Sequence, residues 1–262
     1  MKTLFRLPLQ AHNLHALAGF YTDGVSLTAM HGLSQRLAAD ASLPLEGFAL
    51  TVAHYESTLR HQVKTGMDLM PRAKQTESAS ATAYRYGQLH GALYLLVGED
   101  LAGEDLAAVR EELANTLMRS RIQGAPVIDF IEPTDVFAAR LRTEEDALRW
   151  ALEQEKPLTQ FYFSAHLSVP LDGPALLEHF AQKLATPASV MLCNGYHVFG
   201  TATAVAGDEQ LLAEPCYTLG LARPTYLLKK TPEELPLLAE RFFFSFDQDL
   251  YNTSGGQQLV IR

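Results

Sequence analysis

Cysteine is scarce in this sequence, which has only Cys193 and Cys216 among its 262 residues. Two unclustered thiols supply no zinc quartet and are typical of a reducing compartment, so we expect a cytoplasmic protein. The sequence also lacks any stretch of about 18 uncharged apolar residues, which a membrane-spanning helix needs. Arg6 and Pro8 interrupt the short apolar run at the start, and this pattern predicts no signal peptide.

Familiar catalytic fingerprints are lacking as well. The sequence contains no phosphate-binding Walker loop, no GxGxxG glycine fingerprint, no GxSxG nucleophile motif and no HExxH metal motif. Enzymes that hydrolyse nucleotides, use dinucleotides or bind catalytic zinc therefore lose their best sequence support. We expect no cofactor and no bound metal.

What the sequence does contain is the composition of a globular protein, with 47% hydrophobic and 19% charged residues. Its 21 Lys and Arg against 30 Asp and Glu give a net charge of −9, which taken alone argues against a polyanionic ligand. Residues 99–155, however, hold fourteen of the acids and six Arg, so this segment alone carries −8. We therefore expect one acidic flank and one neutral-to-basic flank on the same fold.

The first half of the chain shows two kinds of hydrophobic pattern. Apolar residues at helical spacing predict helices over about 27–37, with Ser26 as N-cap, and over about 106–117. Runs rich in β-branched and aromatic residues predict four strands, over 3–9, 47–55, 84–97 and 122–131. The resulting order is β-α-β-β-α-β, so the predicted fold class is α+β with a ferredoxin-like core.

The second half repeats this theme more loosely. It predicts a charged helix over 143–154, capped by Thr143, and two short strands within 190–205 that turn at Asn194-Gly195. Further patterns predict strands over 158–169 and 257–261 and helices over 176–184 and 232–243. No sharp linker is present, so we expect a core over 1–132 and a smaller α+β portion over 133–262 that packs on it.

Basic residues gather at two places. Residues 56–83 form a polar insertion with a low-complexity end, and the turn after the second helix contains Gln123 and Gly124. Exposed cations on such segments suit a phosphate backbone, although solvated loops carry Lys and Arg for no binding reason. Gly124 either lets main-chain N–H groups approach a phosphate or caps the preceding helix. The candidate cations are Arg60, Lys64, Arg72, Lys74, Arg85, Arg119 and Arg121.

Histidines and aromatic residues offer further candidates. His12, His15 and His31 lie close together in the sequence, and Tyr21 with His31 has the chemistry for metal-free RNA cleavage. No carboxylate lies at ligand spacing beside them, which favours packing or solvation. The alternating aromatic residues in 161–163 and 242–246 have the pattern of strand core more than of base-stacking platforms.

Taken in order, several segments resemble a family of CRISPR-associated proteins, the RAMP superfamily. The chain is similar to the subunit of the type I-F Csy complex that holds the 5′ handle of the CRISPR RNA. The similar segments are LFRLPLQAHNLHAL, VSLTAMHGLSQRLAAD, GFALTVAHYESTLRHQ, RYGQLHGALYLLV, LAAVREELANTLMRSRIQGAPVI, GYHVFG and YTLGLARPTYLL. Two departures, Gly124-Ala125 in place of adjacent glycines and a shorter middle segment, are typical of a reduced or type IV-like variant.

The resemblance implies a non-catalytic subunit of a Cascade-type complex in antiviral defence. It implies an RRM-like core, a thumb at 56–83 and a glycine turn at 121–125 that contact CRISPR RNA through the seven cations above with Gln123 and Gly124. The subunit would cap the backbone filament and contact the backbone subunit and, where present, a large subunit. Two alternatives stay open: a metal-independent repeat endoribonuclease of the same superfamily, and a protein-only assembly factor.

Overall fold

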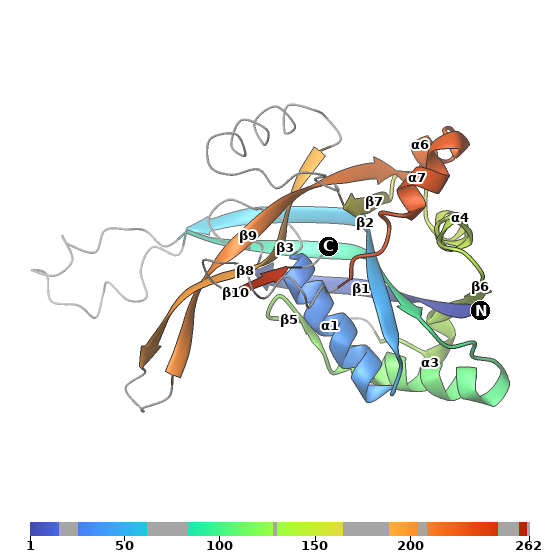
Figure 1. The fold of residues 1–262 in the computed structure, drawn as a ribbon, viewed down its shortest axis with the longest axis horizontal. Coiled ribbons are helices and arrows are strands. Elements are labelled where there is room, and N and C mark those ends of the chain that lie inside the picture. Colours follow the sequence, from blue (N-terminus) through green and yellow to red (C-terminus); the bar gives the residue numbers. More distant parts are fainter. Residues whose placement is uncertain are drawn as a thin grey trace, which may run out of the picture.

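The strands of the computed structural model form one antiparallel sheet of eight, with helices on both faces, and a separate two-stranded ladder (Figure 1). The structure describes residues 1–15, 26–61, 83–127, 130–164, 189–203, 209–245 and 257–260. The first elements are β1 (Lys2–His15), α1 (Leu27–Asp40), β2 (Leu45–His61), β3 (Ala83–Val97), α3 (Gly103–Met118), β4 (Arg121–Ile122), β5 (Ala125–Pro126), η1 (Pro133–Asp135) and β6 (Phe137–Leu141). They are followed by α4 (Glu144–Gln154), β7 (Gln160–Ser164), β8 (Ser189–Thr203), β9 (Glu209–Pro224), α6 (Thr225–Leu228), η2 (Pro232–Glu234), α7 (Leu235–Ala239) and β10 (Gln257–Val260). The fold class is α+β, as the sequence predicts.

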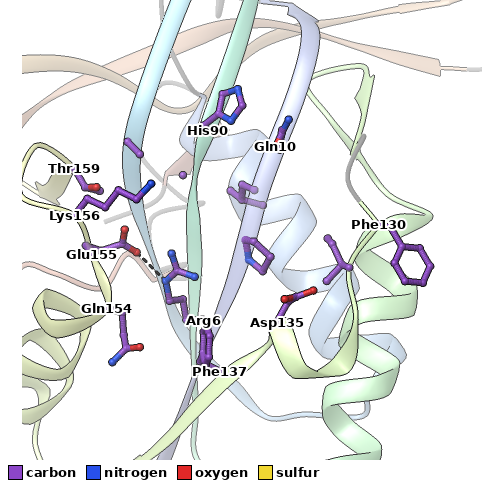
Figure 2. A pocket seen from close by; sticks show the side chains of 15 residues that line it. Arg6, Gln10, His90, Phe130, Asp135, Phe137, Gln154, Glu155, Lys156 and Thr159 are labelled. Atoms are coloured by element: carbon purple, nitrogen blue, oxygen red, sulfur yellow. Dashed lines mark hydrogen bonds and ion pairs between the residues drawn. The ribbon is translucent and has the colours of Figure 1, made fainter.

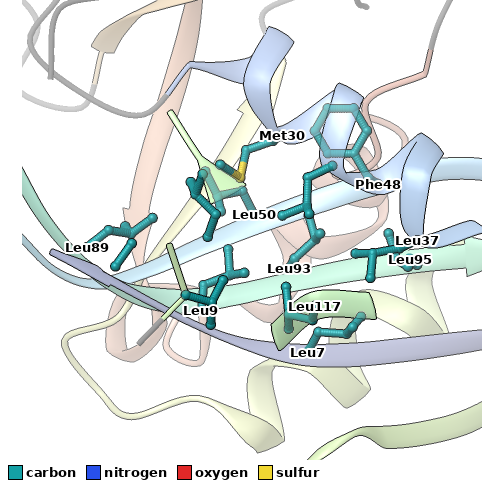
Figure 3. Close-up of a cluster of buried hydrophobic side chains, with 14 of the residues drawn as sticks. Leu7, Leu9, Met30, Leu37, Phe48, Leu50, Leu89, Leu93, Leu95 and Leu117 are labelled. Atoms are coloured by element: carbon teal, nitrogen blue, oxygen red, sulfur yellow. The ribbon is translucent and has the colours of Figure 1, made fainter. Parts of the chain in front are cut away.

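The order of strands in the large sheet is β10-β8-β9-β7-β2-β3-β1-β6. One face of β1, β3 and β2 packs against α1 and α3, which also contact each other. Strand alternation puts Leu7 and Leu9 of β1 and Leu93 of β3 on this face, where they meet Met30 of α1 and Leu117 of α3 (Figure 3). The predicted helical periodicity of α1 and α3 is confirmed, because its apolar positions form this core.

A second core lies on the opposite face. Leu4 of β1 and Tyr94 of β3 point to this side, where they pack with Leu148 of α4, Leu238 of α7 and Phe242. The aromatic residues Phe161, Phe163, Phe242 and Phe244 are all fully buried, which confirms their prediction as core. None of the helices in the described segments is long and apolar enough to cross a bilayer.

The prediction of one strand over 122–131 is wrong. Arg121–Ile122 and Ala125–Pro126 pair with each other as a two-stranded ladder, and only Val127 reaches the large sheet, through an isolated bridge to Ala11. The chain reverses at Gln123 and Gly124, whose φ angles of 45° and 84° end any extended run. The strand beside β1 is instead β6, so a division of the chain at residue 132 falls between strands of one sheet.

The strands around the predicted insertion are longer than expected. β1 extends to His15, and β2 and β3 pair as far as His61 and Ala83. Residues 56–61, predicted as the start of a loop, are therefore strand, because their backbone continues the antiparallel pairing with residues 83–88 of β3. Residues 62–82 lie outside the described part of the chain.

The second half contains another long hairpin, made of β8 and β9. Asn194-Gly195, predicted as a tight turn, lies inside β8, where the pairing register shifts between Cys193 and Gly195. A β-bulge explains this, because it accommodates the same residue types without reversing the chain. The helix predicted over 143–154 is confirmed as α4, whose N-cap Thr143 accepts a 3.0 Å hydrogen bond from the amide of Asp146. The helix predicted over 232–243 is shorter, and the one predicted over 176–184 lies outside the described residues.

Two glycines test how tightly this sheet is packed. A Cβ added at Gly91 of β3 would lie 2.1 Å from the carbonyl oxygen of Thr51, whereas one added at Gly32 of α1 would meet no heavy atom within 4 Å. We expect Gly91→Ala to lower the free energy of unfolding by about 1–3 kcal/mol, because β2 must move. Gly32→Ala should raise it by about 0.5–1 kcal/mol, because alanine favours the helix. Urea denaturation measures both changes, and equal effects would contradict the close approach of β2 and β3.

Candidate nucleic-acid interface

The face of the sheet that packs on α4 and α7 is exposed at its other end. Beyond Gly91, toward the β2–β3 hairpin, the side chains on this face are exposed or half-buried. Most of them are polar, in contrast to the apolar stretch under α4. They are Gln10 and His12 of β1, Gln88 and His90 of β3, and His54 and Glu56 of β2.

Three of these side chains form a row across the three strands, which we call the histidine row. The ring centroid of His90 lies 5.8 Å from that of His12 and 6.0 Å from that of His54. His54 also lies 3.8 Å from the carboxylate of Glu56. Both side chains are more than half exposed, so this pair contributes little to the stability of the fold. Within the described residues no group of His, Cys, Asp and Glu is arranged to hold a metal ion. Flat imidazole rings on an open sheet can stack on bases and donate hydrogen bonds to phosphates.

A cavity of about 520 Å³ opens beside the histidine row (Figure 2). Its lining includes Arg6, Gln10, His90 and Lys156, so most of its polar groups are donors or cations. Phe130 stands at its outer rim with its side chain turned outward. We call this hollow the Arg6 cavity.

A buried hydrogen-bond network forms the floor of the Arg6 cavity. Oε1 of Glu155, the C-cap residue of α4, accepts hydrogen bonds from Arg6 Nε at 2.9 Å, the Tyr94 hydroxyl at 2.7 Å and the Thr51 hydroxyl at 3.3 Å. Burial raises the pKa of the Tyr94 hydroxyl well above its usual range, and the Glu155 carboxylate raises it further. The Tyr94 hydroxyl therefore keeps its proton and donates a hydrogen bond to the carboxylate.

The residues predicted at the glycine turn lie close together. Arg119 is the C-cap of α3 and Arg121 begins β4, and both are exposed. Arg121 Nη1 donates a weak 3.4 Å hydrogen bond to the Gly124 carbonyl, and the Gln123 side-chain oxygen accepts a 3.0 Å bond from the amide of Ser26. Gln123 thus connects the turn to the start of α1. Gly124 is not the cap of α3, so that alternative is wrong.

The residues predicted on the insertion are only partly described. Arg60 is opposite Tyr84 and Arg85 is opposite Leu59, so both backbone positions lie at the outer end of the β2–β3 hairpin. Their side chains, and the whole of Lys64, Arg72 and Lys74, lie outside the described part of the structure.

The histidines predicted as a cluster do not come together. His12 belongs to the histidine row, whereas His31 lies on α1, which packs on the opposite face. Tyr21 and the side chain of His15 lie outside the described residues. Sequence reasoning missed His54 and His90, although strand alternation and the pairing of β2 with β3 carried the signal.

The prediction of a single acidic flank from the charge pattern is also wrong. Glu104 lies on α3 and Glu145 on α4, and these helices cover opposite faces of the sheet. The acidic residues are therefore shared between two faces, because the acidic segment crosses the edge of the sheet at β6.

The chain matches no protein-family model and no curated protein. A function must therefore be argued from the histidine row, the Arg6 cavity and the glycine turn. The resemblance in the sequence is a separate argument.

The hydrogen-bond network under the cavity should contribute to the free energy of unfolding. Tyr94→Phe keeps the ring but removes the hydroxyl that donates to the buried Glu155 carboxylate. We expect it to lower the free energy of unfolding by about 1.5–3 kcal/mol, because a hydrogen bond to a charged group is lost. Tyr226→Phe, at an exposed tyrosine of α6, is the matched control and should change it by less than about 0.5 kcal/mol. Similar values for both in thermal or urea unfolding would contradict the network.

Proposed function

We propose that this chain is a non-catalytic RNA-binding subunit of a Cascade-type complex, which holds the 5′ handle of the CRISPR RNA and contacts the backbone subunit. The observation that carries the proposal is the open polar face of β1, β3 and β2, with the histidine row at its centre. Proteins that bind single-stranded RNA on a sheet use such faces to stack bases and read their edges.

The connections of the core strands support the family. β6, β1, β3 and β2 lie side by side in this order, with α1 between β1 and β2 and α3 between β3 and β6 in the chain. This order supports a ferredoxin-like unit, the RRM-like core that the resemblance implies. The β2–β3 hairpin leads into the segment 56–83, where the resemblance implies a thumb.

The glycine turn and the backbone positions of Arg60 and Arg85 lie at the same end of this unit. The bridge from Val127 to Ala11 brings the glycine turn beside the last third of β1. The same stretch of β1 pairs with β3 next to the hairpin, since His15 is opposite Tyr86. Arg119 and Arg121 are thus available to phosphates that approach the base of the hairpin, in spite of the negative net charge.

Copurification tests this proposal most directly. The tagged full chain is expressed with a repeat-spacer transcript and the bound RNA is sequenced. We expect transcripts that share one constant 5′ segment. The double variant Arg119→Ala/Arg121→Ala should retain at least about tenfold less RNA, because charge-assisted phosphate contacts are lost. Arg142→Ala, at an exposed arginine beyond β6, is the control. Purification without RNA would favour the assembly factor and contradict the proposal.

A second candidate function, metal-independent RNA cleavage, is favoured by one observation. His12 and His90 lie close enough for one imidazole to remove a proton from a 2′-hydroxyl and the other to protonate the leaving oxygen. The open, half-buried setting of His12 and His90 favours binding over catalysis, because within the described residues only His54 of the row has a carboxylate beside it, Glu56 at 3.8 Å.

Incubation of the full chain with repeat RNA and a chelator separates the two functions. We expect the RNA to be bound and to stay intact, because within the described residues no carboxylate pairs with His12 or His90 to orient its ring. Specific cleavage that is lost in His12→Ala and His90→Ala, but kept in His31→Ala, would establish the ribonuclease instead.

A further inference from the structure

The Arg6 cavity holds a cation whose position is fixed before any ligand arrives. The Arg6 side chain is 16% exposed, and its Nε bonds to Glu155 at 2.9 Å while its guanidinium carbon lies 5.9 Å from the centre of the Phe137 ring. Because Glu155 takes Nε, the terminal amino groups of the guanidinium are left on the cavity side, as Figure 2 shows. A guanidinium presented in this way matches the oxygens of a phosphate.

A second cation lies across the cavity from the first. Lys156 directly follows Glu155 and is exposed, and its side chain extends over the cavity and across β2 (Figure 2). The buried hydroxyl of Thr159, which also lines the cavity, has no hydrogen-bond partner among the described residues. The cavity therefore combines two cations with an unused polar group.

The two acids of the cavity limit how much negative charge it accepts. Glu155 pairs with Arg6, and the other acid is Asp135, whose Oδ2 accepts a 2.8 Å hydrogen bond from the amide of Glu132, so the lining has two positive and two negative side chains. A lining with no net charge suits the single charge of a phosphodiester better than the double charge of a free mononucleotide. Asp135 also lies between Arg6 and Phe130, and it repels a second phosphate on that side (Figure 2).

An exposed aromatic side chain stands at the rim of the cavity. Phe130 is 78% exposed at the outer rim, with its ring turned to solvent. An exposed aromatic ring beside a hollow that contains two cations suits single-stranded nucleic acid, because bases stack on aromatic rings and cations contact the backbone.

We propose that the Arg6 cavity is a subsite for single-stranded RNA that seats one phosphodiester between Arg6 and Lys156, with a flanking base stacked on Phe130. This assignment rests on the proposed function and names where on the open face the strand is held. Free nucleotides bind there weakly, because the strand is held at several points at once.

The test uses variants that leave the buried network intact. Arg6 is kept, because its loss would leave the Glu155 carboxylate buried without its cation. Lys156→Ala is compared with Lys229→Ala, and Phe130→Ala with Leu237→Ala, since the control residues are also exposed but lie outside the cavity. The probes are a fluorescent oligouridylate and adenosine monophosphate. Affinity is measured by fluorescence anisotropy over a series of salt concentrations.

We expect Lys156→Ala to lower the slope of log affinity against log salt by about one unit. Phe130→Ala should weaken oligouridylate binding by about 5- to 100-fold, and both controls should behave like the unaltered chain. If the chain binds oligouridylate but neither variant differs from its control, the subsite is wrong and the proposed function stands. If the unaltered chain binds neither repeat RNA nor oligouridylate, both are wrong. Adenosine monophosphate bound as tightly as the oligonucleotide would overturn the subsite in favour of a free-nucleotide site.

Discussion

The carboxylate of Glu155 is the point on which the functional face depends. Its Oε1 accepts hydrogen bonds from Arg6 of β1, Thr51 of β2 and Tyr94 of β3, and so joins three strands to the end of α4. A buried carboxylate is stable only with such partners, so its position fixes where α4 must stop. Beyond that point no helix of the described segments covers the face, and the histidine row is left open. The same carboxylate aligns Arg6, which links the stability of the fold to the chemistry of the cavity.

The net charge of −9 does not conflict with an RNA-binding role, because phosphate recognition depends on local fields. α3 and α4 carry acids on opposite faces of the sheet, while Arg119 and Arg121 lie at the end of α3 that is farthest from its acidic first turn. Acids that do not face the strand reduce nonspecific binding to nucleic acid and leave a few directed cations to position it.

The sequence predicted the positions of helices better than it predicted which strands pair with one another. Apolar spacing located α1, α3 and α4 because a helix buries residues that are near one another in the chain. It misplaced the fourth core strand, because Gln123 and Gly124 reverse the chain after Ile122 and the pairing of β6 with β1 depends on residues far apart. The same limit hid the histidine row: His12, His54 and His90 are brought together by strand register, which no local pattern encodes. Of the predicted site, the described part brings Arg119, Arg121, Gln123 and Gly124 together in one turn.

If the chain binds RNA as proposed, the edge of β1 limits which form of RNA can contact both the glycine turn and the histidine row. β6 pairs with β1 from Lys2 to Arg6, and beyond Arg6 the described residues cover this edge only through the bridge of Ala11 to Val127. The glycine turn lies on the α1 and α3 side of the sheet and the histidine row on the other, so a strand that touches both must pass over this edge. Adjacent strands are about 5 Å apart, and a path of that curvature is open to flexible single-stranded RNA but closed to a rigid A-form duplex. An RNA held by both surfaces as proposed is therefore unpaired where it crosses β1.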